Sequence, residues 1–270
     1  MKITFIGGGN MASALIGGLR KQGYSAAGIQ VVEPDPDKRE QLATAFGVRC
    51  CATIDAASLN CETLVLAVKP QVMREALAPL VGKLSAQLVL SIAAGLRLAD
   101  IGRWLGGYSQ LVRSMPNMPA LIGEGISGVY ADPSVGREGR AMAEKILHAV
   151  GSSLWIEDEA QMDAVTAISG SGPAYVFYFI ESLQLAGRAL GFSDAEARIL
   201  AIETFAGAAK LAESSADPAS VLRERVTSKG GTTAAALDSF NSDGLAAAIL
   251  RGVRAAAARG RELGDQLGQD

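Results

Sequence analysis

A glycine-rich turn near the start of the chain separates two short segments with different hydrophobic patterns. The residues Lys2–Gly9 read Lys-Ile-Thr-Phe-Ile-Gly-Gly-Gly, so a short β-rich run leads directly into the glycines. Met11, Leu15 and Leu19 then recur at four-residue spacing, which is typical of one face of a helix. The sequence therefore predicts a strand, a tight turn and an amphipathic helix in this order.

The turn matches the dinucleotide-binding pattern G-x-G-x-x-A through Gly7, Gly9 and Ala12. The first glycine allows the tight turn, the second lets backbone amides approach a pyrophosphate, and the small third residue lets the helix pack on the strand. The helix N-terminus adds unpaired N–H groups for the anion. Because a strand and a helix flank the glycines on the expected sides, we expect a dinucleotide site here.

Charge and cysteine content argue against several other functions. The 270 residues carry a formal net charge of -3, which gives no basic surplus for binding nucleic acid. Cys50, Cys51 and Cys61 have the spacing of neither a disulfide framework nor a zinc site, so we expect no metal. Such cysteine usage is typical of a reducing cytoplasm.

No segment has the pattern of a signal peptide or a membrane span. The N-terminal apolar run has one Lys and is too short and too broken by glycine to be a signal peptide. The most hydrophobic predicted helix, Ala174–Leu190, is interrupted by Glu181, Gln184 and Arg188. We therefore expect a cytoplasmic protein with no membrane partner.

The pattern of elements divides the chain into two predicted domains, residues 1–158 and 159–270. In the first, β-rich runs alternate with helical stretches, which predicts an α/β domain with a doubly wound, mainly parallel sheet. The second contains alanine-rich helices and no convincing strand. The predicted strands are Ile3–Ile6, Ile29–Glu33, Thr63–Val68, Leu88–Ile92, Gln110–Arg113, Ile126–Tyr130 and Ser153–Ile156.

The helices of the second domain have predicted ends. Gly191 ends one helix, and Ser193 with Glu196 forms a capping box for the next. Asp217-Pro218 begins another helix. Ser242-Asp243 is expected to open the last one.

Charges of both signs follow the second predicted strand, so the preference for one dinucleotide stays open. Glu33 stands where the adenosine ribose would lie, somewhat later than the usual spacing from the glycine turn. A carboxylate there accepts ribose hydroxyls and repels a 2′-phosphate, which favours NAD, although Glu33 is equally explained as a solvated strand end. Lys38 and Arg39 have the charge to pair with a 2′-phosphate, but an exposed helix face explains them better.

Three further loops should lie at the carboxyl edge of the sheet, where ligands bind in such folds. They are Ala67–Pro70, which contains Lys69, then Ile92–Ala94, and the proline-braced loop around Asn117. Lys69 by itself would be read as a surface cation. Its position beside the glycine turn favours a binding role.

Two loops stand out in the helical half. The loop 169–175, Ser-Gly-Ser-Gly-Pro-Ala-Tyr, reads mainly as a helix entry, with Pro173 at the first turn. The loop 227–233, Thr-Ser-Lys-Gly-Gly-Thr-Thr, offers several free N–H groups and two hydroxyls at a helix start. An ordinary N-cap would explain part of it. The number of donors favours a loop that binds a carboxylate and one further polar atom.

These motifs together resemble those of the pyrroline-5-carboxylate reductases. The shared motifs are Gly-Gly-Gly-Asn-Met-Ala, Leu-Ala-Val-Lys-Pro-Gln, Met-Pro-Asn, Ser-Gly-Ser-Gly-Pro-Ala-Tyr and Val-Thr-Ser-Lys-Gly-Gly-Thr-Thr, in that order. The resemblance spans essentially the whole chain. It implies reduction of Δ1-pyrroline-5-carboxylate to L-proline with NADPH, NADH being possible. It also implies a Rossmann domain followed by a helical domain that dimerises by interleaving, with dimers assembled into a larger homo-oligomer.

The resemblance also implies roles for individual residues. Thr233 would be the catalytic residue, its hydroxyl hydrogen-bonding the ring nitrogen of the substrate, while backbone amides at Gly231 and Thr232 hold the carboxylate. The implied substrate-binding residues are Ser228, Gly230, Gly231, Thr232, Thr233 and Asn117. The implied cofactor-binding residues are Ile6, Gly7, Gly8, Gly9, Asn10, Met11, Glu33, Ala67, Val68, Lys69, Pro70, Ile92, Ala93 and Ala94.

The chain departs from the family pattern at two positions. Lys229 replaces a proline that would stiffen the loop, and Ile54 stands where many relatives have an asparagine that contacts the adenosine. The only histidine, His148, lies far from every motif, so we expect it to be structural or exposed rather than an acid. A cyclic imine protonates readily, which leaves the enzyme mainly a positioning task.

Two other functions remain as alternatives. A β-hydroxyacid or ketopantoate-type dehydrogenase shares the plan of Rossmann domain plus helices, but would carry a catalytic lysine early in the second domain, where Ala164–Ala174 has none. A nicotinamide-sensing protein would keep the glycine turn, but would not need the loop Lys229–Thr233.

Overall fold

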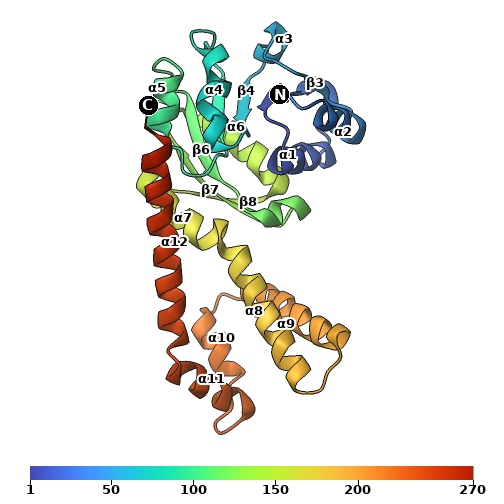
Figure 1. Cartoon of the computed structure of the whole chain (residues 1–270), viewed down its shortest axis with the longest axis vertical. Coiled ribbons are helices and arrows are strands. Elements are labelled where there is room, and N and C mark those ends of the chain that lie inside the picture. Colours follow the sequence, from blue (N-terminus) through green and yellow to red (C-terminus); the bar gives the residue numbers. More distant parts are fainter. Residues whose placement is uncertain (270) are drawn as a thin grey trace. The chain divides into compact units, whose positions relative to one another are not determined.

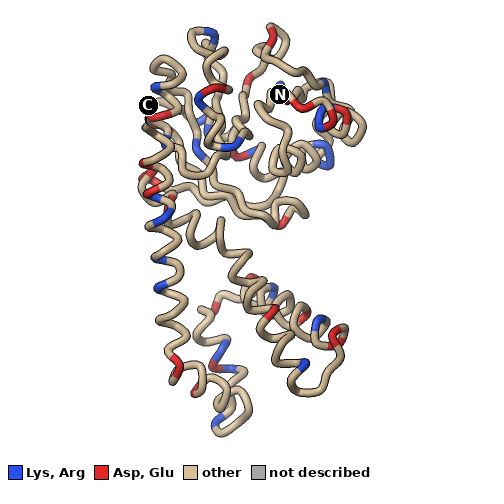
Figure 2. Tube along the Cα trace, in the orientation of Figure 1, with Lys and Arg blue, Asp and Glu red and all other residues tan. Residues whose placement is uncertain are grey.

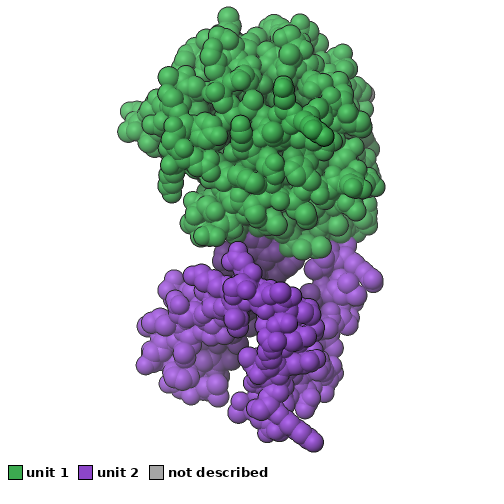
Figure 3. Space-filling view, turned by 180° about the vertical axis from the view of Figure 1, so that it is seen from behind, with its two compact units in different colours: residues 1–171, 256–270 green, residues 172–255 purple. Residues whose placement is uncertain are grey.

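The computed structural model describes residues 1–269, which form two compact units. Unit 1 comprises residues 1–171 together with the segment from Ala256 onward, and unit 2 comprises residues 172–255 (Figure 3). Unit 2 is thus inserted between two parts of unit 1.

Unit 1 is built on one sheet (Figure 1). Its strands have the order β3-β2-β1-β4-β5-β6-β7-β8. Neighbouring strands are parallel except β6 and β7, which are antiparallel. The strands are β1 (Ile3–Ile6), β2 (Ile29–Val32), β3 (Arg49–Cys51), β4 (Thr63–Leu66), β5 (Leu88–Ser91), β6 (Leu111–Met115), β7 (Gly125–Ala131) and β8 (Gly151–Trp155). The doubly wound, mainly parallel sheet is confirmed. The seven predicted strands are present with ends shifted by at most two residues, whereas β3 was missed.

The helices of unit 1 cover both faces of this sheet. In β4, Val65 belongs to one buried apolar cluster while its neighbours Leu64 and Leu66 belong to the other, and successive strand residues point to opposite faces. Helices α1 (Asn10–Lys21) and α6 (Arg137–Leu147) contribute to the first cluster; α4 (Met73–Leu77) and α5 (Leu98–Trp104) contribute to the second. The remaining helices before unit 2 are α2 (Pro36–Phe46), α3 (Ala56–Leu59) and α7 (Met162–Val165).

The end of the chain packs against the loop that follows β5. Arg97 Nη2 lies 2.5 Å from Asp265 Oδ1, and Arg103 Nη2 donates to the Gly268 carbonyl at 2.7 Å. A Cβ placed on Gly264 would lie 2.9 Å from the Gly95 carbonyl oxygen, so the two backbones approach as closely as glycine allows. The segment from Ala256 onward is therefore part of the structure that supports this loop.

Unit 2 contains only helices and turns. These are α8 (Gly172–Ala189), α9 (Asp194–Ser214), α10 (Ala219–Arg225), α11 (Thr232–Ser242) and the first part of α12 (Leu245–Leu267). The capping box of Ser193 and Glu196 is confirmed, with the Glu196 amide donating to Ser193 Oγ and the Ser193 amide to Glu196 Oε2. The predicted start at Ser242-Asp243 is wrong. Ser242 ends α11, and Gly244 with φ +67° follows it, because glycine readily takes the left-handed conformation that stops a helix.

The helices of unit 2 bury very little apolar surface. Among its described residues only Ala197 and Ala201 are buried hydrophobics, whereas the large side chains of Phe177, Tyr178 and Leu190 are mostly exposed. No helix in residues 1–269 is both long enough and apolar enough to span a bilayer. Charges of both signs are interspersed along the chain (Figure 2).

Candidate active site

The turn after β1 has a conformation that requires glycine at its first position. Gly7 has φ +99°, and its amide donates to the Val32 carbonyl at 2.8 Å. A Cβ at this position would lie 2.8 Å from both the Ala67 carbonyl oxygen and the Val68 side chain. The turn is therefore held tightly against β2 and the loop after β4, as the sequence motif predicts.

The N-terminus of α1 presents backbone donors with no side chain in front of them. Gly9 is the N-cap, has an ordinary φ of -74°, and makes no side-chain cap; the first turn contains no acidic residue. A Cβ on Gly9 would meet nothing within 4 Å, so the space over the turn is open. Ala12 is fully buried beneath it. Free N–H groups, an uncompensated helix end and open space fit a pyrophosphate.

The predicted cofactor loops of unit 1 meet along one edge of the sheet. Strands β1, β4, β5 and β6 are consecutive neighbours and parallel, so their carboxyl ends share an edge. The Ala67 amide donates to the Ile6 carbonyl at 2.8 Å, and the Ile92 amide to the Leu66 carbonyl at 3.1 Å. The ladders thus continue one residue beyond the strands and fix both loops. Gly7–Met11, Ala67–Pro70 and Ile92–Ala94 are brought together there, with Lys69 exposed.

Glu33 lies directly after β2 and next to the glycine turn. Its Oε2 accepts from the Gly8 amide at 2.8 Å, and its Oε1 accepts from the Asp35 amide at 3.1 Å. The residue is 8% exposed. The interpretation of Glu33 as a solvated strand end is therefore wrong, because its carboxylate is a buried acceptor for the turn itself.

Asn117 connects three segments of unit 1. Its Nδ2 donates to the Ser169 carbonyl at 3.1 Å, and its Oδ1 accepts from the Ile126 amide at 3.0 Å. Ser169 lies in the π-helical turn Thr166–Gly170 that precedes α8; such turns are frequent at functional sites. The side chain thus joins the loop after β6 to this turn and to β7. A role of Asn117 in binding substrate stays a prediction.

We expect Asn117→Ala to lower the free energy of unfolding of unit 1 by about 1–3 kcal/mol. The substitution removes both hydrogen bonds at once and leaves the partly buried Ile126 amide and Ser169 carbonyl without this partner. Urea denaturation is the measurement, and Asn60→Ala, at an exposed asparagine of the same unit, is the control. Overlapping unfolding curves for Asn117→Ala and the unmodified protein would contradict the proposed connection.

In unit 2 the predicted substrate residues lie in the turn before α11 and at the first positions of that helix. Gly230 has φ +71°, and the Gly231 amide donates to the Ser228 carbonyl at 3.0 Å. Gly231 is the N-cap of α11 and supplies no side-chain cap, and no acidic residue lies in the first turn. The first amides of α11, at Thr232 and Thr233, therefore point out of the helix end without intrahelical partners. The arrangement suits a carboxylate.

The cysteines and the histidine lie outside the predicted site loops. Burial raises the pKa of the Cys50, Cys51 and Cys61 thiols, which keeps them protonated. His148 is half exposed, and its Nε2 lies 3.1 Å from Ser153 Oγ. Within residues 1–269 no cluster of three or more His, Cys, Asp or Glu side chains is placed to hold a metal.

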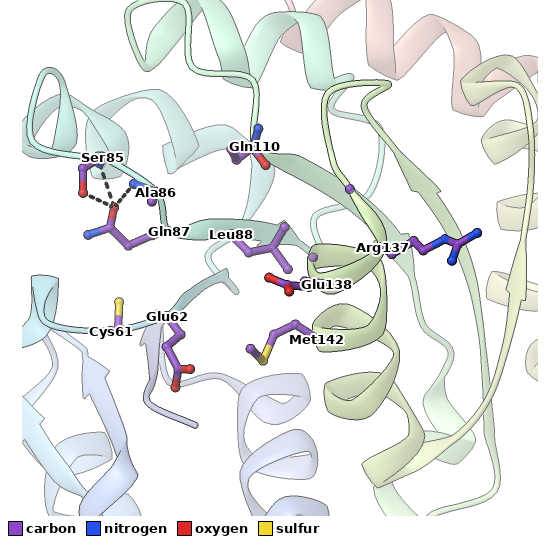
Figure 4. Close-up of a pocket in the computed structure, with 12 residues that line it drawn as sticks. Cys61, Glu62, Ser85, Ala86, Gln87, Leu88, Gln110, Arg137, Glu138 and Met142 are labelled. Atoms are coloured by element: carbon purple, nitrogen blue, oxygen red, sulfur yellow. Dashed lines mark hydrogen bonds between the residues drawn. The ribbon is translucent and has the colours of Figure 1, made fainter.

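A depression of about 640 Å³ lies at the opposite, amino-terminal edge of the sheet (Figure 4). It is lined by residues at or just before the starts of β4, β5 and β6 and by the beginning of α6. The acidic side chains of Glu62 and Glu138 lie in it, while Arg137 points away. None of the predicted site residues lines this depression.

Sequence reasoning missed Asp35, which the structure places beside Glu33. Asp35 is the N-cap of α2, and its Oδ1 accepts from the amides of Asp37 and Lys38. The signal was present, because Asp followed by Pro is a common helix start, with Pro at the first helical position. The π-helical turn at 166–170 was also missed, and no local sequence pattern marks it.

Two family models match the chain. A model described as pyrroline-5-carboxylate reductase dimerisation matches residues 159–263, and one described as NADP oxidoreductase coenzyme F420-dependent matches residues 2–95. A pyrroline-5-carboxylate reductase from Pseudomonas aeruginosa is 45% identical over 271 residues, which covers 99% of this chain and 98% of the relative.

Solved structures show the same similarity. A pyrroline-5-carboxylate reductase from Coxiella burnetii has a TM-score of 0.92 at 38% identity, covering 97% of this chain and 98% of that one. The Plasmodium falciparum pyrroline carboxylate reductase with NADP bound has a TM-score of 0.87 at 29% identity, covering 98% of each chain.

Proposed function

The chain belongs to the pyrroline-5-carboxylate reductase family, and we propose that it transfers a hydride from NAD(P)H to the imine carbon of Δ1-pyrroline-5-carboxylate, giving L-proline. This is the last step of proline biosynthesis. The observation that carries the proposal is that the helices following the two predicted binding loops, α1 and α11, begin without a side-chain cap and without an acidic residue in the first turn. One suits a pyrophosphate and the other suits the carboxylate of a small substrate.

The loop before α11 is proposed to hold the substrate. The amides of Thr232 and Thr233 bind the carboxylate, and the Thr233 hydroxyl hydrogen-bonds the ring nitrogen. The Gly231 amide, expected from the sequence to hold the carboxylate, donates to the Ser228 carbonyl instead. Ser228 and Gly230 shape this turn, since the Ser228 carbonyl accepts from the Gly231 amide and Gly230 has a positive φ. The substrate carboxylate is then fixed relative to the carbon that accepts the hydride.

The carboxyl edge of the sheet in unit 1 is proposed to hold the cofactor. A reduced nicotinamide, when bound, supplies the hydride. Gly9–Met11 bind the pyrophosphate through backbone amides, because the amides of Gly7 and Gly8 already donate to Val32 and Glu33. Ala67–Pro70 and Ile92–Ala94 line the path toward the nicotinamide. The small side chains of Ala93 and Ala94 leave room for a flat ring. The sequence predicts NADPH as the reductant, with NADH possible.

The reaction adds one hydride to carbon and one proton to nitrogen of the C=N bond. No histidine is needed, because a cyclic imine protonates readily in water. The residues of the chain contribute by holding two reactants in one orientation, which turns a bimolecular encounter into an effectively intramolecular step. Substitutions in these loops should therefore lower the rate by misaligning the two reactants and not by removing a proton donor.

The chain is proposed to work as a homodimer, with dimers assembled into a larger oligomer. The dimerisation model matches residues 159–263, and the helices of unit 2 leave their large apolar side chains exposed in the single chain. A second copy that covers these side chains would supply the core that unit 2 lacks.

We expect the purified protein to oxidise NADPH or NADH rapidly with Δ1-pyrroline-5-carboxylate and not with ketopantoate. Absorbance of the reduced nicotinamide measures the rate. 1-Pyrroline, which lacks the carboxylate, should be a poor substrate, with kcat/KM lower by about 100-fold or more, since charge-assisted hydrogen bonds are lost. Cofactor binding without turnover of the pyrroline substrate would favour a nicotinamide-sensing protein instead.

A further inference from the structure

Two carboxylates occupy the backbone donors at the carboxyl end of β2. Glu33 accepts from the Gly8 amide at 2.8 Å and from the Asp35 amide at 3.1 Å. A carboxylate with two charge-assisted hydrogen bonds to backbone and only 8% exposure is held in a single place. Its negative charge is fixed beside the glycine turn, where an adenosine ribose would approach.

Asp35 occupies the second set of donors. As N-cap of α2 (Pro36–Phe46), it accepts from the Asp37 amide at 3.0 Å and from the Lys38 amide at 3.3 Å. These amides form the helix N-terminus that a phosphate on the ribose would otherwise use. The chain therefore neutralises this helix end with its own carboxylate.

The two nearby cations are also engaged. Lys38 Nζ lies 3.8 Å from Asp35 Oδ2. Arg39 Nη1 donates to the carbonyl oxygens of Glu33 at 2.8 Å and Pro34 at 2.6 Å. Both residues that the sequence offers for pairing with a 2′-phosphate thus have other partners in the structure.

From this geometry we propose that the adenosine subsite takes a ribose with free hydroxyls and rejects a 2′-phosphate, so that NADH is the preferred reductant and Glu33 determines the specificity. The inference rests on the proposed function only in taking a nicotinamide dinucleotide as the reductant. Each carboxylate oxygen has a further lone pair, so Glu33 can accept from ribose hydroxyls while keeping its backbone partners. A 2′-phosphate would bring nearly two negative charges against a buried one.

The direct test measures binding without turnover. Titration calorimetry of the full-length protein with ADP-ribose and with 2′-phospho-ADP-ribose reports the subsite alone. We expect the unphosphorylated ligand to bind at least about tenfold more tightly. Equal affinities, or tighter binding of the phosphorylated ligand, would overturn the proposal.

Variants identify the residue responsible. Glu33→Gln keeps the shape and one acceptor but removes the charge, so the ratio of the two affinities should fall by about tenfold. Glu40→Gln removes one charge from an exposed position on α2, the helix that follows Glu33, and should leave the ratio unchanged. A ratio that is the same in Glu33→Gln as in the unmodified protein would exclude Glu33 as the determinant. A general disturbance of the glycine turn would lower both affinities alike and would leave their ratio unchanged.

Rates with NADH and NADPH complete the test. The ratio of the two kcat/KM values with Δ1-pyrroline-5-carboxylate should follow the binding ratio in each variant. A binding preference for ADP-ribose in a protein that does not reduce the pyrroline substrate would refute the proposed reaction and leave this inference standing. A protein that reduces the substrate fastest with NADPH would support the proposed reaction and refute this inference.

Discussion

Replacing Gly7 with valine is expected to abolish dinucleotide binding and to destabilise unit 1. Gly7 has φ +99°, which is a rare conformation for a β-branched residue, and its Cβ would lie 2.8 Å from the Ala67 carbonyl oxygen. Backbone strain and overpacking together should lower the free energy of unfolding by about 2–4 kcal/mol. The turn must also move away from the loop after β4, so affinity for ADP-ribose should fall by more than about 100-fold. Urea denaturation and calorimetry measure the two effects.

Gly9→Ala is the matched control because it separates binding from folding. Gly9 has φ -74° and open space around its Cβ position, so the substitution should change the free energy of unfolding by less than about 0.5 kcal/mol. The added methyl group nevertheless stands where the pyrophosphate would approach, and affinity for ADP-ribose should fall by about 10- to 100-fold. Normal affinity in Gly9→Ala would place the pyrophosphate somewhere else.

Thr233→Ala is expected to reduce kcat by about 100-fold with little change in the affinity for ADP-ribose. The substitution removes the hydroxyl proposed to hold the ring nitrogen, while the backbone amides at the start of α11 remain to bind the carboxylate. Removal of one positioned donor from a reaction centre typically costs two to three powers of ten in kcat, about 100- to 1,000-fold. Steady-state rates at saturating cofactor measure this loss.

Two further variants make the test of Thr233 specific. Thr233→Ser retains a hydroxyl and should recover most of the activity. Thr204→Ala removes a threonine from an exposed position on α9 and should leave kcat unchanged. Full activity in Thr233→Ala would remove this residue from the mechanism, whereas equal losses in the alanine and serine variants would indicate a packing role.

The strands of unit 1 were predictable because most of them are short β-rich runs buried between two helical layers. β3 (Arg49–Cys51) was missed because it has three residues, begins with an exposed arginine and lies at the edge of the sheet, where apolar patterning is weak. In unit 2, Ser242-Asp243 has the composition of an N-cap. However, Gly244 follows this pair with a positive φ, and α11 therefore ends there.

The site was predictable where it depends on the local chain and not where it depends on distant partners. The loops after β1, β4 and β5 follow from strand ends in a parallel sheet. The acceptor role of Glu33 depends on the Gly8 amide 25 residues away, and the Asn117 amide meets Ser169 at a separation of 52 residues. The usual spacing from the glycine turn relates an acidic residue such as Glu33 to the ribose and not to the Gly8 amide, so the sequence alone left Glu33 open between two interpretations.

The order in which a ribosome releases this chain has a consequence for cofactor binding. Residues 1–171 emerge first, but the loop after β5 receives Gly264 and Asp265 only when the final helix has been synthesised. In a nascent chain stalled anywhere within unit 2, Arg97 therefore lacks its ion-pair partner Asp265, and Gly95 lacks the contact with Gly264. Domains generally fold in order of synthesis, yet unit 1 is completed last because another unit is inserted into it. Truncated translation products should accordingly compete poorly for the cellular dinucleotide pool.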